Sequence, residues 1–460
     1  CVTNKNLKLQ NILLLIASYF FYACWDWRFL FLLVFSTFLD YYTGLKMSNE
    51  ENQKKKKNWF WISVIANLGF LATFKYYNFF IESFGEALSE VGIKINPWTL
   101  NFILPVGISF YTFHGLSYVI DIYKNKIKAE GDFINYAVFV GFFPLLVAGP
   151  IERATHLLPQ IVKPRTFNYG MAVDGLRQIL WGFFKKIVIA DNCAVFANEV
   201  FGDFHNQSGS TLLFGAFFFA IQIYCDFSGY SDIAIGTAKL FGIELLRNFS
   251  YPYFSRDIAE FWRRWHISLS SWFRDYLYIP LGGNKGNLWL KIRNVFIIFI
   301  VSGFWHGANW TFIAWGALNA LFFLPLLLSN KNRLNTNSVA EGRFFPNAKE
   351  TLQIVATFSL TLIAWIFFRS ATVTAAFDYL EIMFSNSMFS FPNLAKETLL
   401  TFSLIVFFML VEWAQREKPH GLFFANTSVP QKLRWAIYVG VFTTIAVFGG
   451  VQQEFIYFQF

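Results

Sequence analysis

Apolar runs of membrane-spanning length recur along the whole chain, and they constrain its fold more than any other feature of the sequence. An α-helix of about 20 apolar residues crosses the hydrocarbon core of a bilayer. Because lipid offers no hydrogen bonds, a spanning segment must satisfy its backbone polar groups internally, as a helix does. Charged residues make up 15% of the 460 residues, against roughly a quarter in soluble proteins. The sequence therefore predicts an all-α polytopic membrane protein with roughly ten or more membrane segments.

The sequence marks some of these spans more clearly than others. Some runs are long and nearly free of charge, whereas others are short, split or carry charged residues. The clearer runs are residues 59–81, 100–120, 133–148, 211–240, 304–328, 351–368, 401–411 and 433–448. The less certain runs are residues 12–23, 29–45, 179–196 and 295–302.

Membrane topology accounts for the net charge of +9. Basic residues gather in loops beside apolar runs, as the positive-inside rule requires, so nucleic acid is not a predicted partner. The lysine run at 54–57 precedes Trp59 and Trp61, and we expect a cytoplasmic boundary there. Simple alternation of sides would place the basic residues of 153–165 outside. We therefore expect one nearby segment to re-enter the membrane or to lie flat on it.

The sequence favours a single transmembrane domain over residues 1–460, with a possible subdivision at the polar linker 329–350. The four cysteines form no close pair and no zinc-like spacing, so neither a disulfide framework nor a bound metal is predicted. The sequence begins with Cys1 rather than Met, and we expect that an N-terminal segment is missing from it.

The stretch 257–283 has the pattern of one amphipathic helix. Its apolar face carries Trp262 and Trp265, its polar face carries Arg263 and Arg264, and His266 falls at the edge between the faces. Two interpretations are open. The helix could lie in the headgroup region, rich in Trp and Arg as such helices are. It could instead line a wet cavity in which the arginines face anionic groups and the histidine faces a reaction.

His306 follows Trp305 within the apolar segment "SGFWHGANWTF". Gly303 and Gly307 leave room for another group to approach, and Asn309 is close enough along a continuous helix to share the face of His306. A neutral imidazole in such surroundings resists protonation and stays available as a general base. The residue types support a structural histidine equally well.

Asp226 and Asp232 lie in another apolar segment, where ionisable residues are functional candidates. Their spacing of six places them on different faces of a helix, so a catalytic carboxylate pair is not predicted. We expect each to accept hydrogen bonds from neighbouring helices or from an arginine such as Arg263.

Several motifs together resemble the bacterial branch of the membrane-bound O-acyltransferases, of the type that acetylates alginate. The resemblance runs from about residue 11 to the end of the chain. The peptidoglycan-acetylating proteins are similar, and the proteins that transfer D-alanine to teichoic acid are more distant. The motifs are "FFPLLVAGPIER" (142–153), "CDFSGYSDIAIG" (225–236), "FWRRWHISLSSWFRDYLYIPLGGNKG" (261–286), "VSGFWHGANWTFIAWG" (301–316) and "FIYFQF" (455–460).

This resemblance implies a fold of about eleven spans, with re-entrant and amphipathic segments around a central tunnel. The catalytic histidine of the family falls on His306, and a second histidine of the bacterial branch falls on His266. An additional hydrophobic segment that usually precedes residues 11–35 is absent here. The residues that we predict to contact substrate are Asn309, Arg263, Arg264, Trp262, Trp265, Trp305 and Asp226.

The implied activity is the transfer of an acyl group, chiefly acetyl, from a cytoplasmic donor to hydroxyls of an exported polysaccharide. Acetyl-CoA is the expected donor, and no bound cofactor is expected. The implied location is the bacterial inner membrane, with a periplasmic acetyltransferase as a partner protein. Two alternatives are a transporter of acyl groups or lipids that serves a separate transferase, and a D-alanyl transferase fed by a carrier protein.

Overall fold

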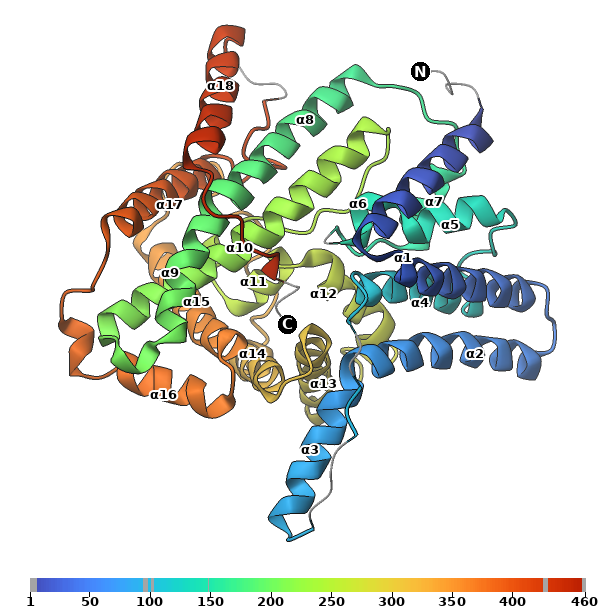
Figure 1. The fold of residues 1–460 in the computed structure, drawn as a ribbon, viewed down its shortest axis with the longest axis horizontal. Coiled ribbons are helices and arrows are strands. Elements are labelled where there is room, and N and C mark those ends of the chain that lie inside the picture. Colours follow the sequence, from blue (N-terminus) through green and yellow to red (C-terminus); the bar gives the residue numbers. More distant parts are fainter. Residues whose placement is uncertain (1–5, 94–97, 101–102, 148, 425–428, 457–460) are drawn as a thin grey trace. The chain divides into compact units, whose positions relative to one another are not determined.

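Every regular element in the described part of the chain is a helix, which confirms the predicted all-α fold (Figure 1). The computed structural model describes residues 6–93, 98–100, 103–147, 149–424 and 429–456.

The chain forms two compact units. The first comprises Cys1–Ala172 and Ala238–Leu246, and the second comprises Val173–Thr237 and Arg247–Phe460. The polar linker 329–350 lies within the second unit.

The first unit is built around α1 (Leu7–Ser48), which packs against α2, α4 and α5 (Figure 1). The two predicted runs 12–23 and 29–45 form this one helix, with a kink where Asp26 takes the extended values φ −156° and ψ 109°. The other elements of the unit are α2 (Gln53–Leu71), the π-helical η1 (Ala72–Tyr76), α3 (Tyr77–Glu90), α4 (Ile108–Tyr123), α5 (Phe133–Gly141), α6 (Phe143–Leu146) and α7 (Ala154–Ile161).

A buried hydrogen-bond network joins α1 to α2. Ser63 Oγ and Asn67 Nδ2 both donate to Asp40 Oδ1, at 2.5 and 2.7 Å. Ser36 Oγ donates to Asn67 Oδ1 at 2.8 Å. Because a buried polar group without a partner is costly, this network fixes how the two apolar helices pack.

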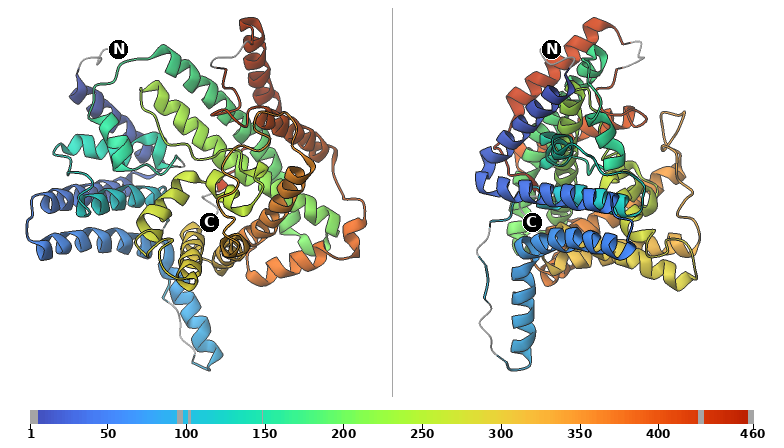
Figure 2. Two further views of the ribbon diagram at one scale, coloured as in Figure 1. Left: turned by 180° about the vertical axis from the view of Figure 1, so that it is seen from behind. Right: turned by 90° about the vertical axis from the view of Figure 1, so that its right-hand side faces the viewer.

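The second unit holds the two histidine motifs. In it α13, α14 and α15 lie side by side, as Figures 1 and 2 both show. Its elements are most of α8 (Tyr169–Phe183), the π-helical η2 (Phe184–Ala190), α9 (Asp191–Gly202), η3 (Phe204–Asn206), most of α10 (Gly209–Leu240), η4 (Pro252–Phe254), α11 (Ile258–Arg264), α12 (Ile267–Phe273), the π-helical η5 (Arg274–Tyr278), α13 (Leu288–His306), α14 (Trp310–Leu328), α15 (Ala348–Arg369), α16 (Val373–Met383), η6 (Asn386–Phe389), α17 (Lys396–Ala414) and α18 (Gln431–Phe448).

Some predicted spans are divided in the structure. The run 304–328 is not one helix, because the chain leaves the helical conformation after His306 and starts α14 at Trp310. The run 133–148 is interrupted at Phe142, where ψ is 111°, and its residue 148 lies outside the described part.

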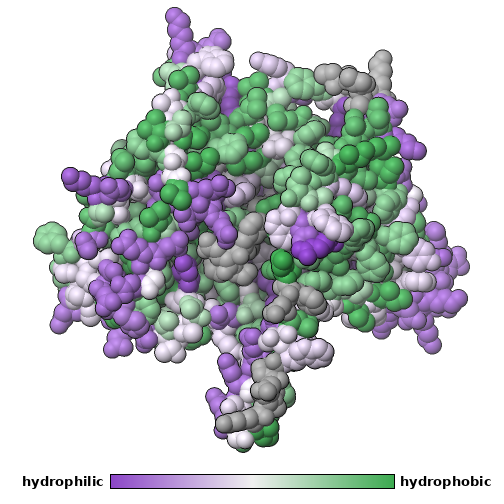
Figure 3. Space-filling view, in the orientation of Figure 1, coloured by the Kyte–Doolittle hydropathy of each residue, from purple (hydrophilic) through white to green (hydrophobic). Residues whose placement is uncertain are grey.

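Six helices in the described part of the chain are long and apolar enough to cross a membrane, namely α1, α10, α13, α14, α15 and α17. Apolar residues make up much of the surface seen in Figure 3. The large apolar side chains exposed on α1 and α18 include Ile16, Phe20, Phe31, Trp435, Val439 and Phe442. Such a surface is suited to lipid, and soluble monomers rarely expose large contiguous apolar patches.

Two glycines allow α13 and α14 to pack closely. A Cβ atom on Gly303 would lie 2.1 Å from the carbonyl oxygen of Phe312, and one on Gly316 would lie 2.3 Å from that of Phe299. These distances are far below van der Waals contact. Any side chain at either position therefore requires the two helices to move apart.

We predict that Gly316→Ala destabilises the protein by about 1–3 kcal/mol, the usual cost of overpacking. The measurement is thermal unfolding of the purified protein in detergent. Gly440→Ala in α18 is the matched control, because a Cβ there meets no atom within 4 Å. Equal unfolding temperatures for the two variants would contradict the close packing of α13 and α14.

Candidate functional site

The stretch 257–283 turns sharply at His266, so the prediction of one amphipathic helix is wrong. α11 ends at Arg264 and α12 begins at Ile267. His266 has φ 42° and ψ 53°, the left-handed conformation, which cannot continue a right-handed helix. A left-handed residue other than glycine persists only where its surroundings hold it.

Contacts from Asn248 and Ser250 hold this turn. The backbone N–H of Ile267 donates to the carbonyl of Asn248 at 2.8 Å, and that of Ser250 donates to Arg264 at 2.9 Å. The Oδ1 atom of Asn248 lies 2.9 Å from His266 Nδ1. Main-chain and side-chain bonds thus act together on the turn, and they come from the loop that follows α10.

His306 is the last residue of α13. The sequence predicted that Asn309 shares the helix face of His306. This prediction is wrong, because α13 ends at His306, before Asn309. Asn309 instead caps α14, with Oδ1 accepting from Thr311 N at 2.9 Å, while its Nδ2 donates to the carbonyl of Ala371 at 3.0 Å. The room that Gly307 provides is filled by Phe312, whose ring atom Cε2 lies 2.1 Å from where a Cβ would be.

The two histidines lie together in an aromatic environment that we call the histidine cluster. Their ring centroids are 6.5 Å apart. His266 is fully buried and His306 is 5% exposed. The cluster consists of these two residues and the rings of Phe227, Trp305, Trp315 and Phe368, with centroid distances to a histidine from 4.6 to 6.0 Å.

The electrostatic state of His266 follows from its burial. Burial lowers the pKa of this imidazole to about 3, so the ring is neutral at physiological pH. Its Nε2 atom is buried and has no hydrogen-bond partner among the described residues. A neutral ring with a buried unpartnered nitrogen can serve a ligand, and buried polar atoms without partners are uncommon in proteins.

The two tryptophans of α11 and the turn lie in different surroundings. Trp262 donates from Nε1 to Asn319 Oδ1 at 3.2 Å and packs edge-on against Phe299. Trp265 is buried and stacks against Phe261. Neither tryptophan belongs to an exposed interfacial helix face.

The two arginines are held by different partners. Arg263 donates to the carbonyls of Asn332 and Asn335 at 2.9 and 2.6 Å. Arg264 forms an ion pair with the buried Glu260 at 2.9 Å. Arg263 thereby ties α11 to the polar segment after α14, whereas Arg264 pairs with a residue of its own helix.

A cavity of about 480 Å³ opens beside α11. Its lining is mostly apolar, with arginines among the polar side chains. Trp262 and Arg263 line it, whereas Arg264 and Trp265 do not. The other arginines at its wall are Arg274 and Arg333. Apolar walls with a few polar groups are typical of small-molecule sites.

Asp226 binds other parts of the protein. It pairs with Lys186 at 2.8 Å, and Lys186 also pairs with Asp191 at 2.7 Å. The other oxygen of Asp226 accepts from the backbone N–H of Ile456 at 2.8 Å. Asp226 thus has its partner on a neighbouring helix, which is the first of the two predicted alternatives, and not Arg263; the carboxylate also holds the segment at Ile456 against α10. A substrate contact of Asp226 stays a prediction.

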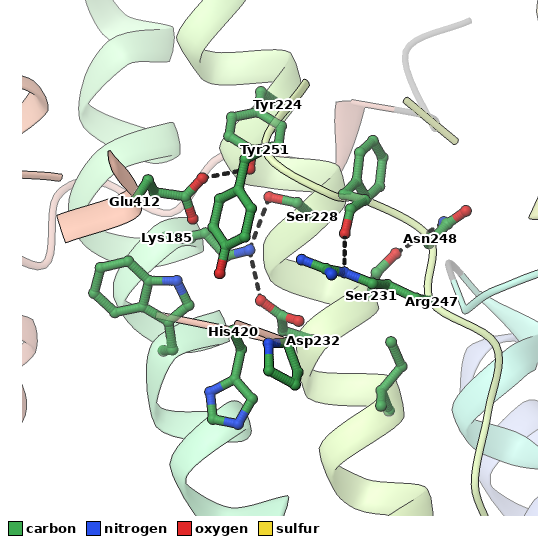
Figure 4. A pocket seen from close by; sticks show the side chains of 14 residues that line it. Lys185, Tyr224, Ser228, Ser231, Asp232, Arg247, Asn248, Tyr251, Glu412 and His420 are labelled. Carbon is green, nitrogen blue, oxygen red and sulfur yellow. Dashed lines mark hydrogen bonds and ion pairs between the residues drawn. The ribbon is translucent and has the colours of Figure 1, made fainter. Parts of the chain in front are cut away.

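A second polar cluster lies on α10, η2 and α17, and of its residues only Asp232 was predicted from the sequence as a candidate (Figure 4). Lys185 pairs with Asp232 at 2.6 Å and donates to Ser228 at 2.9 Å, while Tyr224 donates to Glu412 at 2.5 Å. These residues line a cavity of about 20 Å³. The sequence signals were Asp232 inside the run 211–240 and the charge inside the run 179–196, and Asp232 accepts from a neighbouring helix as predicted.

In the part of the chain that the structure describes, no group of three or more His, Cys, Asp or Glu side chains is placed to hold a metal ion.

Comparison with known proteins places these features in context. Residues 12–333 match the model of the family described as MBOAT, the membrane-bound O-acyltransferase family. The matched region includes both histidines and the whole of α10 to α14.

Three relatives illustrate the range of similarity. The probable alginate O-acetylase AlgI of Pseudomonas aeruginosa is 39% identical over 85% of this chain and 73% of its own length. The peptidoglycan O-acetyltransferase of Helicobacter pylori is 33% identical over 99% of this chain and 92% of its own. The teichoic acid D-alanyltransferase of Streptococcus thermophilus is 30% identical over 63% of this chain and 75% of its own.

We predict that Asp226→Ala lowers the free energy of unfolding by about 1–3 kcal/mol, because it removes a charged acceptor from Lys186 and from Ile456. Thermal unfolding in detergent measures the effect. The control is Glu86→Ala, which removes an exposed carboxylate from α3. If the two variants unfold at the same temperature, the Asp226 contacts do not hold the C-terminal segment.

Proposed function

Because this chain belongs to the membrane-bound O-acyltransferase family, we propose that it transfers an acetyl group from a cytoplasmic donor to hydroxyls of an exported polysaccharide. Acyl transfer to oxygen is the activity of the family, and this protein is an O-acyltransferase. The names of the relatives that act on alginate and peptidoglycan support acetyl as the group and a glycan as the acceptor.

The pairing of His266 and His306 is the observation that carries the proposal. In the proposed reaction, the acceptor hydroxyl attacks the acyl carbon of a thioester, and a C–O bond forms as the C–S bond breaks. His306 takes the hydroxyl proton and returns it to the leaving sulfur. His266 holds a reactant beside it, and Trp305 helps to exclude water. A general base of this kind contributes roughly 10²–10⁴ in rate.

The cavity beside α11 is proposed as the site for acetyl-CoA. Its apolar wall suits the acyl and pantetheine portions, and Arg263 can face phosphate groups. Trp262 would contact the donor, whereas Arg264 and Trp265 would support the wall from within. Asn309 would act by fixing the chain that follows His306.

The remaining proposals concern the surroundings of the reaction. A central tunnel through a bundle of about eleven spans would join a cytoplasmic donor to an acceptor beyond the bacterial inner membrane. In a mixed version of the proposal, a periplasmic acetyltransferase would receive the acetyl group first and complete the transfer to the glycan. The similarity to the D-alanyltransferase makes a D-alanyl carrier protein the second candidate donor.

We predict that His306→Ala lowers acyl transfer roughly 10²–10⁴-fold, because the base is lost. The assay uses membrane vesicles that hold equal amounts of each protein, with radiolabelled acetyl-CoA on the cytoplasmic face. Label that reaches a glycan acceptor or is released is counted. His205→Ala is the matched control, because it removes an exposed histidine in η3.

Near-wild-type transfer by His306→Ala would contradict the role of His306 as base. Equal label turnover by the wild type and by His306→Ala would favour the alternative in which the protein transports the acyl group for a separate transferase. Turnover only with a charged D-alanyl carrier protein would replace acetyl-CoA as the donor.

A further inference from the structure

We infer that Asn248 is a positioning residue for the transferase reaction, which holds His266 as the tautomer with its proton on Nδ1 and leaves Nε2 as a hydrogen-bond acceptor. The inference rests on the proposed function, in which His266 contacts a reactant. Asn248 lies outside the two histidine motifs of the sequence, and its role comes from the contacts of its side chain.

The contact between Asn248 and His266 indicates which ring nitrogen carries the proton. The carboxamide oxygen Oδ1 of Asn248 lies 2.9 Å from His266 Nδ1 and also accepts from Ser268 Oγ at 2.8 Å. A carboxamide oxygen can accept but cannot donate, so the imidazole nitrogen beside it must carry the proton. In a neutral imidazole the other nitrogen, Nε2, then has a free lone pair.

The NH₂ end of the Asn248 carboxamide contacts α10. Its Nδ2 atom donates to Ser231 Oγ of α10 at 3.0 Å, and the whole residue is buried (Figure 4). Turning the amide over would place its NH₂ group against His266 and Ser268 and its oxygen against Ser231. In the observed orientation Oδ1 faces His266 and Ser268 while Nδ2 faces Ser231, and this orientation corresponds to a proton on Nδ1 of His266.

The backbone and the side chain of Asn248 make different contacts with the turn. The backbone carbonyl of Asn248 accepts from Ile267 N at 2.8 Å, and this bond helps to hold the left-handed turn at His266. A substitution at Asn248 keeps this main-chain bond and removes only the side-chain contacts. The main-chain bonds at the turn can therefore stay in place when the side-chain contacts that set the tautomer are removed.

Aromatic rings surround His266 on its other sides. The rings that face it are Phe227, Phe249, Trp305 and His306. Of these four residues, only His306 has an ionisable side chain. Nε2 has no partner among the described residues, so in this tautomer it is available to accept from a hydroxyl or N–H group that enters the histidine cluster.

Two substitutions of Asn248 test the inference by activity. Asn248→Leu keeps the size and removes the hydrogen bonds of the side chain, and we expect kcat to fall about 10–100-fold, as on removal of other residues that orient a histidine, while KM for acetyl-CoA changes less than about twofold. Asn248→Asp keeps an acceptor beside Nδ1, so we expect it to retain more activity than Asn248→Leu. The added carboxylate favours the imidazolium and raises the pKa of His266, so the acid side of the pH–rate profile moves to higher pH.

The tautomer is also measurable without turnover. In protein labelled with ¹⁵N-histidine, the His266 signals are assigned by their loss in His266→Gln. We expect a protonated Nδ1 and an unprotonated Nε2 in the wild type and in Asn248→Asp, and a mixture of tautomers in Asn248→Leu. Asn67→Leu is the control, because it removes a buried asparagine of the α1–α2 network and should leave both the spectrum of His266 and the turnover per folded molecule unchanged.

The outcomes separate this inference from the proposed function. A wild-type His266 protonated on Nε2, or one whose spectrum is the same in Asn248→Leu, would overturn the inference. So would equal losses of activity in the Leu and Asp variants with one common pH profile. If His306→Ala is inactive while Asn248→Leu is fully active, the positioning role fails and the proposed function stands. If no variant transfers acetyl but the tautomers respond as expected, the proposed function fails and the assignment of Asn248 to the tautomer stands.

Discussion

A polar side chain inside an apolar interior must find its partner within the protein, and this requirement organises the second unit. Lys186 meets Asp226, Lys185 meets Asp232, and Asn248 meets His266. The first two pairs join η2 to α10, and the third joins the segment after α10 to the turn between α11 and α12. Because the two partners of each pair lie on different segments of the chain, these contacts fix the relative positions of those segments. Apolar packing alone would not fix them.

The helical fold and the two histidine motifs could be predicted because both are local properties of the sequence. Apolar length selects helices in lipid, and the motif residues stand in consecutive positions. The turn at His266 could not be predicted. Its apolar periodicity continues smoothly through 257–283, and the left-handed conformation depends on Asn248, which is distant along the chain. The end of α13 at His306 was hidden for the same reason, since the apolar run extends across it.

Neighbouring residues of α11 show how far a sequence pattern can assign a site. Helical geometry separates the directions of adjacent side chains by about 100°, so "WRRW" does not act as one unit. Trp262 and Arg263 face the cavity of about 480 Å³, whereas Arg264 is paired with Glu260. Residue type and motif identified the right stretch, but only tertiary contacts distinguish the side chains that can meet a ligand from those that support the wall.

The cap of α14 has a mechanical consequence. Asn309 binds the carbonyl of Ala371 in the connection after α15, and Phe368 near the end of α15 packs on His306. His306 and the chain that follows it are thereby both in contact with the stretch 368–371. A displacement of that stretch would therefore act on the imidazole and on the chain that follows it at the same time.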